Sequence, residues 1–174
     1  MPSYETGYTG GLVENEMLGT AQLERGKHAR AQIEYQPYQQ AIKTVREGQP
    51  GDPSDPEARF ANDLHATIAE ILKLENYSQL KFFTAVGSTL DRFHGVDGFF
   101  ELQADPSSSE STIIVTLDIT MNPQKGDQYK ADHIIEIPTD GLDPKEDKEA
   151  FTALVKTTAQ QIVKLLEAQL VVVA

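Results

Sequence analysis

Residues 112–120, Thr-Ile-Ile-Val-Thr-Leu-Asp-Ile-Thr, carry the strongest strand pattern in this chain. Most of these positions hold β-branched residues, which pack well on a pleated sheet. Because side chains alternate between the two faces of a strand, the odd positions 113–119 form an apolar face, and Asp118 lies on the opposite face between Thr116 and Thr120. The apolar face requires a core, so we expect a helix to cover it.

A second acid precedes another predicted strand. Residues 93–102 read Phe-His-Gly-Val-Asp-Gly-Phe-Phe-Glu-Leu, and we predict a strand over 98–103. Asp97 and Glu101 share one face of that segment. Asp is depleted in strands and is costly to bury without a partner. In a meander, Asp97 and Asp118 would lie side by side near one end of the sheet, which predicts a small acidic site suited to a divalent metal.

The remaining elements follow from caps, spacing and turn residues. They are a helix over 56–76, strands over 80–86 and 131–137, a loop over 87–95 and a helix from 144. Asp55 and Asp143 are predicted N-caps, because each is followed by a proline at the first helical position. Residues 170–173 either extend the last helix or form one more strand. We therefore expect an α+β or mixed α/β fold with a mostly antiparallel central sheet flanked by helices.

Glycine and proline cluster over 47–56, a composition typical of a linker. We therefore divide the chain into a polar, partly helical N-terminal arm over 1–54 and an α/β domain over 55–174. Tyr38, Ile42 and Val45 have helical spacing and predict a weakly docked helix within the arm.

The segment after Asp118 predicts which side chains approach it. A hairpin that turns at residues 125–126 would place Asp118 opposite His133. A slip of one residue would bring Lys130 or Asp132 toward that face instead. In either register, a carboxylate and a histidine or lysine converge.

Composition limits the partners. The chain has 174 residues, no cysteine and a formal net charge of -12, so thiol chemistry is excluded and long-range attraction to nucleic acid is opposed. Bound cations would offset the carboxylates locally, so a nuclease remains compatible with this charge.

No apolar run reaches the roughly 20 residues that span a bilayer, and the N-terminus lacks a signal-peptide pattern. We expect a cytoplasmic protein that does not enter membranes.

Gly95-Val96-Asp97 before one strand, and Asp118-Ile119-Thr120 on the next, resemble the motif of the PD-(D/E)XK nuclease superfamily. This resemblance implies a restriction-endonuclease-like core over roughly residues 55–174. It also implies that Asp97 and Asp118 hold Mg²⁺ or Mn²⁺, joined by an acid from the first helix, either Glu70 or Glu57.

The motif departs from the superfamily at one position. The resemblance implies a lysine two residues after the second acid, where it would position or activate the attacking water, but Thr120 stands there. A hydroxyl supplies no positive charge to the transition state. Lys125 or Lys130 would have to take that role, with Thr120, His133 and Glu101 as auxiliary residues.

Two hypotheses of different classes remain open. The first is a magnesium-dependent endonuclease or exonuclease that hydrolyses phosphodiesters of DNA. The second is a non-catalytic acidic protein of phage or plasmid origin on the same fold. This protein would bind a protein partner, or a second copy of itself, through the N-terminal arm. A mimic of DNA, suggested by net charge alone, is a weaker third hypothesis.

Overall fold

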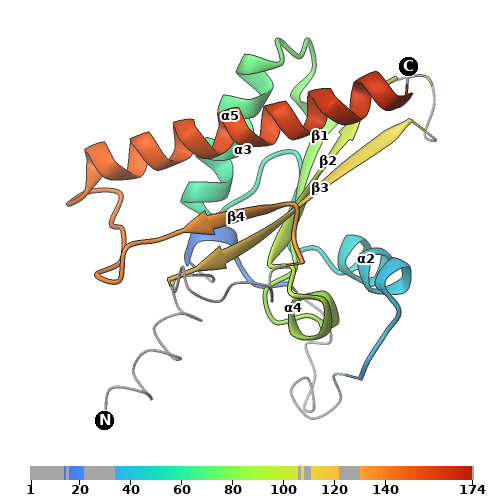
Figure 1. The fold of residues 1–174 in the computed structure, drawn as a ribbon, viewed down its shortest axis with the longest axis horizontal. Helices are drawn as coiled ribbons and strands as arrows, with labels where there is room; N and C mark the ends of the chain where they lie inside the picture. Colours follow the sequence, from blue (N-terminus) through green and yellow to red (C-terminus); the bar gives the residue numbers. More distant parts are fainter. Residues whose placement is uncertain are drawn as a thin grey trace.

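One sheet of four strands, in the order β1-β2-β3-β4, forms the centre of the molecule (Figure 1). The strands are β1 Leu80–Thr84, β2 Gly98–Gln103, β3 Thr112–Thr120 and β4 His133–Glu136. The pairs β1–β2 and β2–β3 are antiparallel, whereas β3–β4 is parallel. The computed structural model describes residues 14, 16–21, 34–105, 107, 111–121 and 130–173. For residues 171–173 it describes the backbone only. The chain therefore has the mixed α and β composition and the mostly antiparallel sheet that its sequence predicts.

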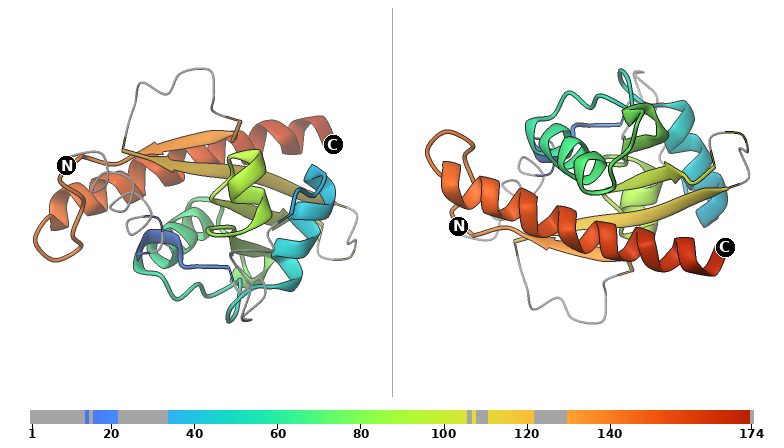
Figure 2. Two further views of the ribbon diagram at one scale, coloured as in Figure 1. Left: turned by 90° about the horizontal axis from the view of Figure 1, so that it is seen from below. Right: turned by 90° about the horizontal axis from the view of Figure 1, so that it is seen from above.

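Helices cover both faces of this sheet (Figures 1 and 2). Helices α3 (Arg59–Ile71) and α5 (Lys148–Val173) lie on one face, which we call the α3/α5 face. Helices α2 (Tyr38–Glu47) and α4 (Thr89–His94) lie on the other, the α2/α4 face. The odd positions of β3 from Ile113 to Ile119 are buried in the core beneath α3 and α5, as the strand pattern predicts.

A second, smaller core lies under α2 and α4. Ala41, Ile42 and Val45 of α2 are at most 1% exposed, and they pack with Phe83 and Phe99 of the sheet. The prediction of a weakly docked helix in the arm is therefore wrong for α2. This helix shares a core with the α/β domain because its apolar stripe faces the aromatic side chains of β1 and β2.

Both predicted N-caps lie in turns that precede the helices. Helix α3 begins at Arg59, and the carboxylate of Asp55 accepts a hydrogen bond from the Asn62 side chain at 2.8 Å. Helix α5 begins at Lys148, and one carboxylate oxygen of Asp143 accepts from two backbone N–H groups, of Lys145 and Glu146. Aspartate side chains accept backbone hydrogen bonds in turns as readily as at helix N-termini. The sequence pattern therefore predicts the turn before each helix but not the first residue of the helix.

The predicted loop over 87–95 contains a helix, α4. The Ser88 hydroxyl accepts a hydrogen bond from the backbone N–H of Asp91, as an N-cap does. Gly95, at a φ of 67°, adopts the left-handed conformation that ends helices. Residues 170–173, left open between helix and strand, continue helix α5.

The hairpin between β3 and β4 is a wrong prediction, because the two strands run parallel. The carboxylate of Asp132 accepts hydrogen bonds from the backbone N–H and the hydroxyl of Thr116, at 2.9 and 3.1 Å, and fixes the start of β4 beside the middle of β3. His133 consequently pairs with Leu117, and Ile134 pairs with Asp118. The turn predicted at residues 125–126 lies outside the described residues.

Gly98 lies where the Phe82 ring and the backbone oxygen of Phe83 leave no room for a side chain. A Cβ atom there would be 2.9 Å from Cζ of Phe82 and 3.1 Å from the backbone oxygen of Phe83. We expect Gly98→Ala to lower the free energy of unfolding by about 1–3 kcal/mol, the usual cost of overpacking. Urea denaturation measures this change.

A second variant tests the cause. Leucine at position 82 removes the ring atom that meets the new Cβ, so Gly98→Ala should lower the free energy of unfolding by less in a Phe82→Leu background. If the loss is equal in both backgrounds, the contact with the Phe82 ring is not its cause.

Candidate functional site

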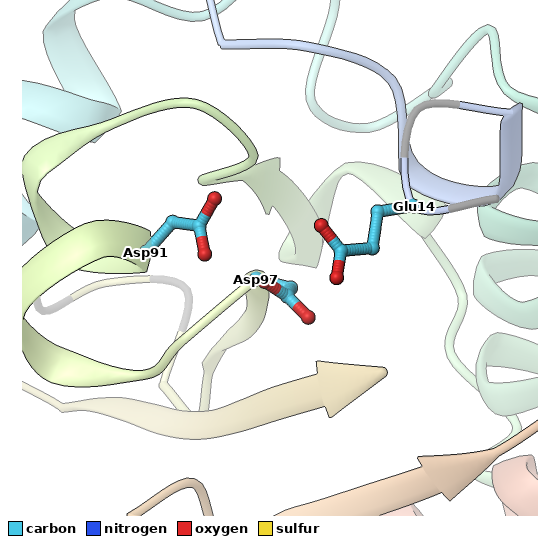
Figure 3. A group of neighbouring side chains, drawn as sticks. All are labelled: Glu14, Asp91 and Asp97. Atoms are coloured by element: carbon cyan, nitrogen blue, oxygen red, sulfur yellow. The ribbon is translucent and has the colours of Figure 1, made fainter. Parts of the chain in front are cut away.

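Three carboxylates converge at the end of the sheet where β2 begins (Figure 3). Glu14, Asp91 and Asp97 each present an oxygen, and these oxygens lie within 4.8 Å of one another. Glu14 comes from a short helical segment near the N-terminus, Asp91 from the first turn of α4, and Asp97 from the residue before β2. The site is thus assembled from three separate parts of the chain.

Asp118 adds a fourth carboxyl group. In the β2–β3 register Gly98 lies opposite Leu117, so one step further along Asp97 lies opposite Asp118. The side chains of Asp118 and Asp91 lie within hydrogen-bonding reach of the Asp97 carboxyl. Its Oδ2 atom also accepts from the backbone N–H of Ile119 at 2.8 Å. The structure therefore brings together the two strand acids that the sequence singles out, with Asp97 at the centre of the group. We call Glu14, Asp91, Asp97 and Asp118 the acidic site.

Local hydrogen bonds fix Asp91. Its backbone N–H donates to the Ser88 hydroxyl, and its Oδ2 atom accepts from the backbone N–H of Gly87 at 2.9 Å. The return bond goes to Gly87 and not to the N-cap residue Ser88, so the arrangement is a variant of a capping box, and it holds the carboxylate at the start of α4.

The segment that carries Glu14 is anchored to the end of β1. The carbonyl of Gly19 accepts from the Thr84 hydroxyl at 2.6 Å, and the backbone N–H of Ala21 donates to the carbonyl of Val86 at 3.0 Å. Met17 and Leu18 are buried in the core beneath α3 and α5. These contacts bring the N-terminal segment to the same end of the sheet as Asp97.

Asp97 is only 2% exposed, and its environment opposes ionisation. Burial raises the pKa of its carboxyl to about 11, and the hydrogen bond with Asp118 and the nearby charges of Glu14 and Asp91 act in the same direction. Carboxylates this close cannot all ionise unless a cation intervenes. Without a cation, Asp97 therefore holds a proton at neutral pH.

The ligand atoms of the acidic site are all oxygens, the type that hard divalent cations prefer. Oxygens on opposite sides of one such ion lie twice the oxygen–metal distance apart, which is about 4 Å for Mg²⁺ and about 5 Å for Ca²⁺. The spacing of at most 4.8 Å among Glu14, Asp91 and Asp97 is compatible with that geometry. These residues therefore form a group of oxygens that could hold a divalent cation.

Two other acids predicted for the site lie elsewhere. Glu70 is exposed on α3, which covers the α3/α5 face of the sheet, whereas Asp118 lies on the α2/α4 face. Glu101 pairs with Arg46 of α2, with 2.6 Å between Nε and Oε2, and lies four residues along β2 from Asp97. Glu70 therefore does not join the acidic site, where Glu14 and Asp91 lie beside Asp97 instead.

The basic residues predicted near Asp118 are not part of the described acidic site. His133 shares the α3/α5 face with Leu117, because paired residues of parallel strands point to the same side, and burial lowers its pKa. Lys130 is exposed just before β4, and Lys125 lies outside the described residues. Thr120 follows Asp118 on the α2/α4 face and is 5% exposed.

Sequence reasoning missed Glu14 and Asp91. The capping pattern of Ser88 and Asp91 is visible in the sequence and indicates a short helix there, although it does not reveal that Asp91 turns toward Asp97. No pattern around Glu14 indicates its contact with a strand that begins more than eighty residues later. Both placements depend on tertiary packing.

Comparison with known proteins leaves the acidic site as the main guide to function. No protein-family model, curated protein or solved structure matches this chain. Among the helices of the described ranges, none is both long enough and apolar enough to cross a membrane.

Proposed function

We propose that this chain is a divalent-cation-dependent nuclease that hydrolyses phosphodiester bonds of DNA, on a core of the PD-(D/E)XK type. The observation that carries the proposal is the meeting of Asp97 and Asp118 with Asp91 and Glu14 at one end of the sheet. Helix α3 followed by three antiparallel strands, with acids before the second strand and on the third, agrees with the first part of such a core. The order of the last two elements departs from it, because α5 follows β4.

In this proposal the four carboxylates hold Mg²⁺ or Mn²⁺. The bound ion would polarise a phosphate oxygen and lower the pKa of a coordinated water. Asp97 would release its proton as the ion binds, while the backbone N–H of Ile119 keeps its carboxylate oriented. Thr120 carries no charge and does not replace the lysine of the motif, so in this proposal that role would fall to Lys125, which lies outside the described residues.

Plasmid nicking in the presence of Mg²⁺ tests the chemistry. We expect the wild-type protein to convert supercoiled DNA to the open circular form, and Asp97→Ala and Asp118→Ala to lose at least about a hundredfold in rate, since each removes a proposed metal ligand. Asp132→Asn is a matched control, because Asp132 also accepts a backbone hydrogen bond near this end of the sheet but lies outside the acidic site. Unchanged nicking in Asp97→Ala would refute the assignment.

The alternative is a non-catalytic interaction or scaffold protein on the same fold. Thr120 favours it, because this buried and uncharged side chain occupies the position where the nuclease motif has lysine. Binding of Mn²⁺ without nicking of any DNA form would support this alternative, and the cation would then stabilise the fold without supporting hydrolysis.

A further inference from the structure

Two exposed tyrosines lie where the segment before α2 meets α4. Tyr35 is 63% exposed and Tyr38 is 39% exposed. Both rings lie against the ring of His94, with 5.6 Å between the ring centres in each case. Nε2 of His94 lies 2.7 Å from the carbonyl oxygen of Gln36, which ties α4 to the segment that carries Tyr35. We call Tyr35 and Tyr38 the tyrosine pair.

Carboxylates border the tyrosine pair. Burial raises the pKa of the Tyr38 hydroxyl, and the nearby charge of Asp132 raises this pKa further. Oδ2 of Asp132 accepts hydrogen bonds from Thr116, whereas within the described ranges no donor reaches Oδ1 and no lysine or arginine pairs with this carboxylate. On the other side, Asp91 of the acidic site is three residues before His94 on α4, so the two residues are neighbours on one helix face.

The charge around the tyrosine pair favours a cationic group. The face of an aromatic ring attracts cations, and this chain already shows such a contact, because the guanidinium of Arg92 lies 5.9 Å from the centre of the Phe93 ring. Arg92 is the one arginine or lysine of α4 and residues 34–38, whereas Glu34, Asp91 and Asp132 supply carboxylates around the pair. Among the described residues, no cation lies over either ring of the tyrosine pair.

The net charge of the whole chain narrows the kind of partner. At -12, the chain repels phosphate groups and also a second copy of itself. It attracts a basic surface, and complementary charge both speeds such an encounter and selects the partner. Tyrosine and arginine are also the side chains that contribute most often to binding free energy at protein–protein interfaces.

We propose that the tyrosine pair docks a basic segment of a protein partner, with an arginine side chain stacked on the rings beside the carboxylate of Asp132. A guanidinium is planar, so it can stack on a ring and donate to a carboxylate at the same time. Rings that already pack against His94 lose little side-chain entropy on binding. The inference goes beyond the proposed nuclease function and does not depend on it.

Fluorescence anisotropy with a labelled oligoarginine peptide, in EDTA, tests the docking surface. We expect the wild-type protein to bind the peptide and Tyr35→Ala to weaken binding about tenfold, the usual effect of losing an aromatic anchor. Tyr35→Phe keeps the ring face and should bind like the wild type, whereas Tyr35→Leu keeps an apolar side chain without the ring and should bind as weakly as Tyr35→Ala. Tyr77→Ala is the matched control, because Tyr77 is also exposed, at 42%, but contacts His65 beside α3.

A second peptide, with citrulline in place of arginine, separates charge from shape. Citrulline has nearly the same shape as arginine but no charge, so this peptide should not bind, and added salt should weaken binding of the oligoarginine peptide.

Several results would overturn the inference. They are absence of oligoarginine binding, equal affinity of Tyr35→Ala and wild type, and citrulline binding as tight as arginine binding. Tighter binding of an oligodeoxythymidylate, lost in Tyr35→Ala, would assign the tyrosine pair to nucleic acid instead. A dimer that Tyr35→Ala dissociates in sedimentation analysis would assign the pair to self-association. Because the assay contains no divalent cation, failure of the metal proposal does not change the result expected here.

Discussion

Asp97→Asn is expected to stabilise the cation-free protein at about pH 8. At this pH the folded wild type must keep a proton on its buried carboxyl, which lowers its free energy of unfolding. Asparagine is neutral in both the folded and the unfolded state, so it does not carry this cost. Its amide oxygen can still accept from the backbone N–H of Ile119, and its NH₂ group can donate to Asp118 and Asp91. We expect the free energy of unfolding to rise by at least about 1.4 kcal/mol, the equivalent of one unit of pKa shift. Urea denaturation in EDTA measures this difference.

The same variant should change how stability depends on pH. The pKa of Asp97 is about 11 in the folded protein, against an ordinary value of 3.8, so the folded state holds a proton that the unfolded chain has lost across this interval. The stability contributed by Asp97 is therefore complete below the unfolded-state pKa of 3.8, and it declines as pH rises toward the folded-state pKa of about 11. Asp97→Asn removes this decline.

Asp132→Asn is the control for both effects, because Asp132 lies outside the acidic site. It should show neither the rise in stability nor the change in pH dependence. If Asp97→Asn instead destabilises the protein at about pH 8 in EDTA, Asp97 acts there as an ionised acceptor, and the protonated acidic site is contradicted.

Phe100→Ala is expected to be the most destabilising single change in the core. Phe100 is fully buried in β2, its ring centre lies 5.0 Å from that of Phe82, and it stacks with His65 of α3 at 6.5 Å. Truncation would leave a cavity where β1, β2 and α3 meet, and such changes lower the free energy of unfolding by about 3–5 kcal/mol.

Chemical denaturation of Phe100→Ala, Phe100→Leu and Tyr77→Ala gives the comparison. Leucine should recover part of the loss because it refills some of the cavity, and the exposed Tyr77 should matter little. A cost below about 1 kcal/mol for Phe100→Ala would contradict the packing of α3 on this face of the sheet.

The central strands could be predicted from sequence because their signals are local. Residues 98–103 form β2 with the predicted bounds, and β3 begins at the predicted residue. The direction of β4 could not be predicted, because it depends on the contact between Asp132 and Thr116, sixteen residues apart. Short helix α4 was missed because a six-residue helix shows little periodicity, although its caps are visible in the sequence.

For the acidic site, alternation along two neighbouring strands was enough to bring Asp97 and Asp118 together. Glu70 was wrongly included because the sequence does not reveal which face of the sheet α3 covers. His133 was wrongly placed because a parallel β4 moves it to the opposite face from Asp118. Glu14 and Asp91 complete the acidic site only through tertiary packing.

Calorimetric titration with Mn²⁺ at about pH 8, in two buffers of different ionisation enthalpy, tests the central claim most directly, because ligand deprotonation is coupled to metal binding. We predict one bound ion and the release of about one proton, that of Asp97, because a metal-binding carboxyl must be ionised. Asp97→Asn should lose both the binding and the proton release, and Asp132→Asn should keep both. Absence of binding in the wild type, or binding without proton release that Asp97→Asn leaves unchanged, would contradict a cation site built around Asp97.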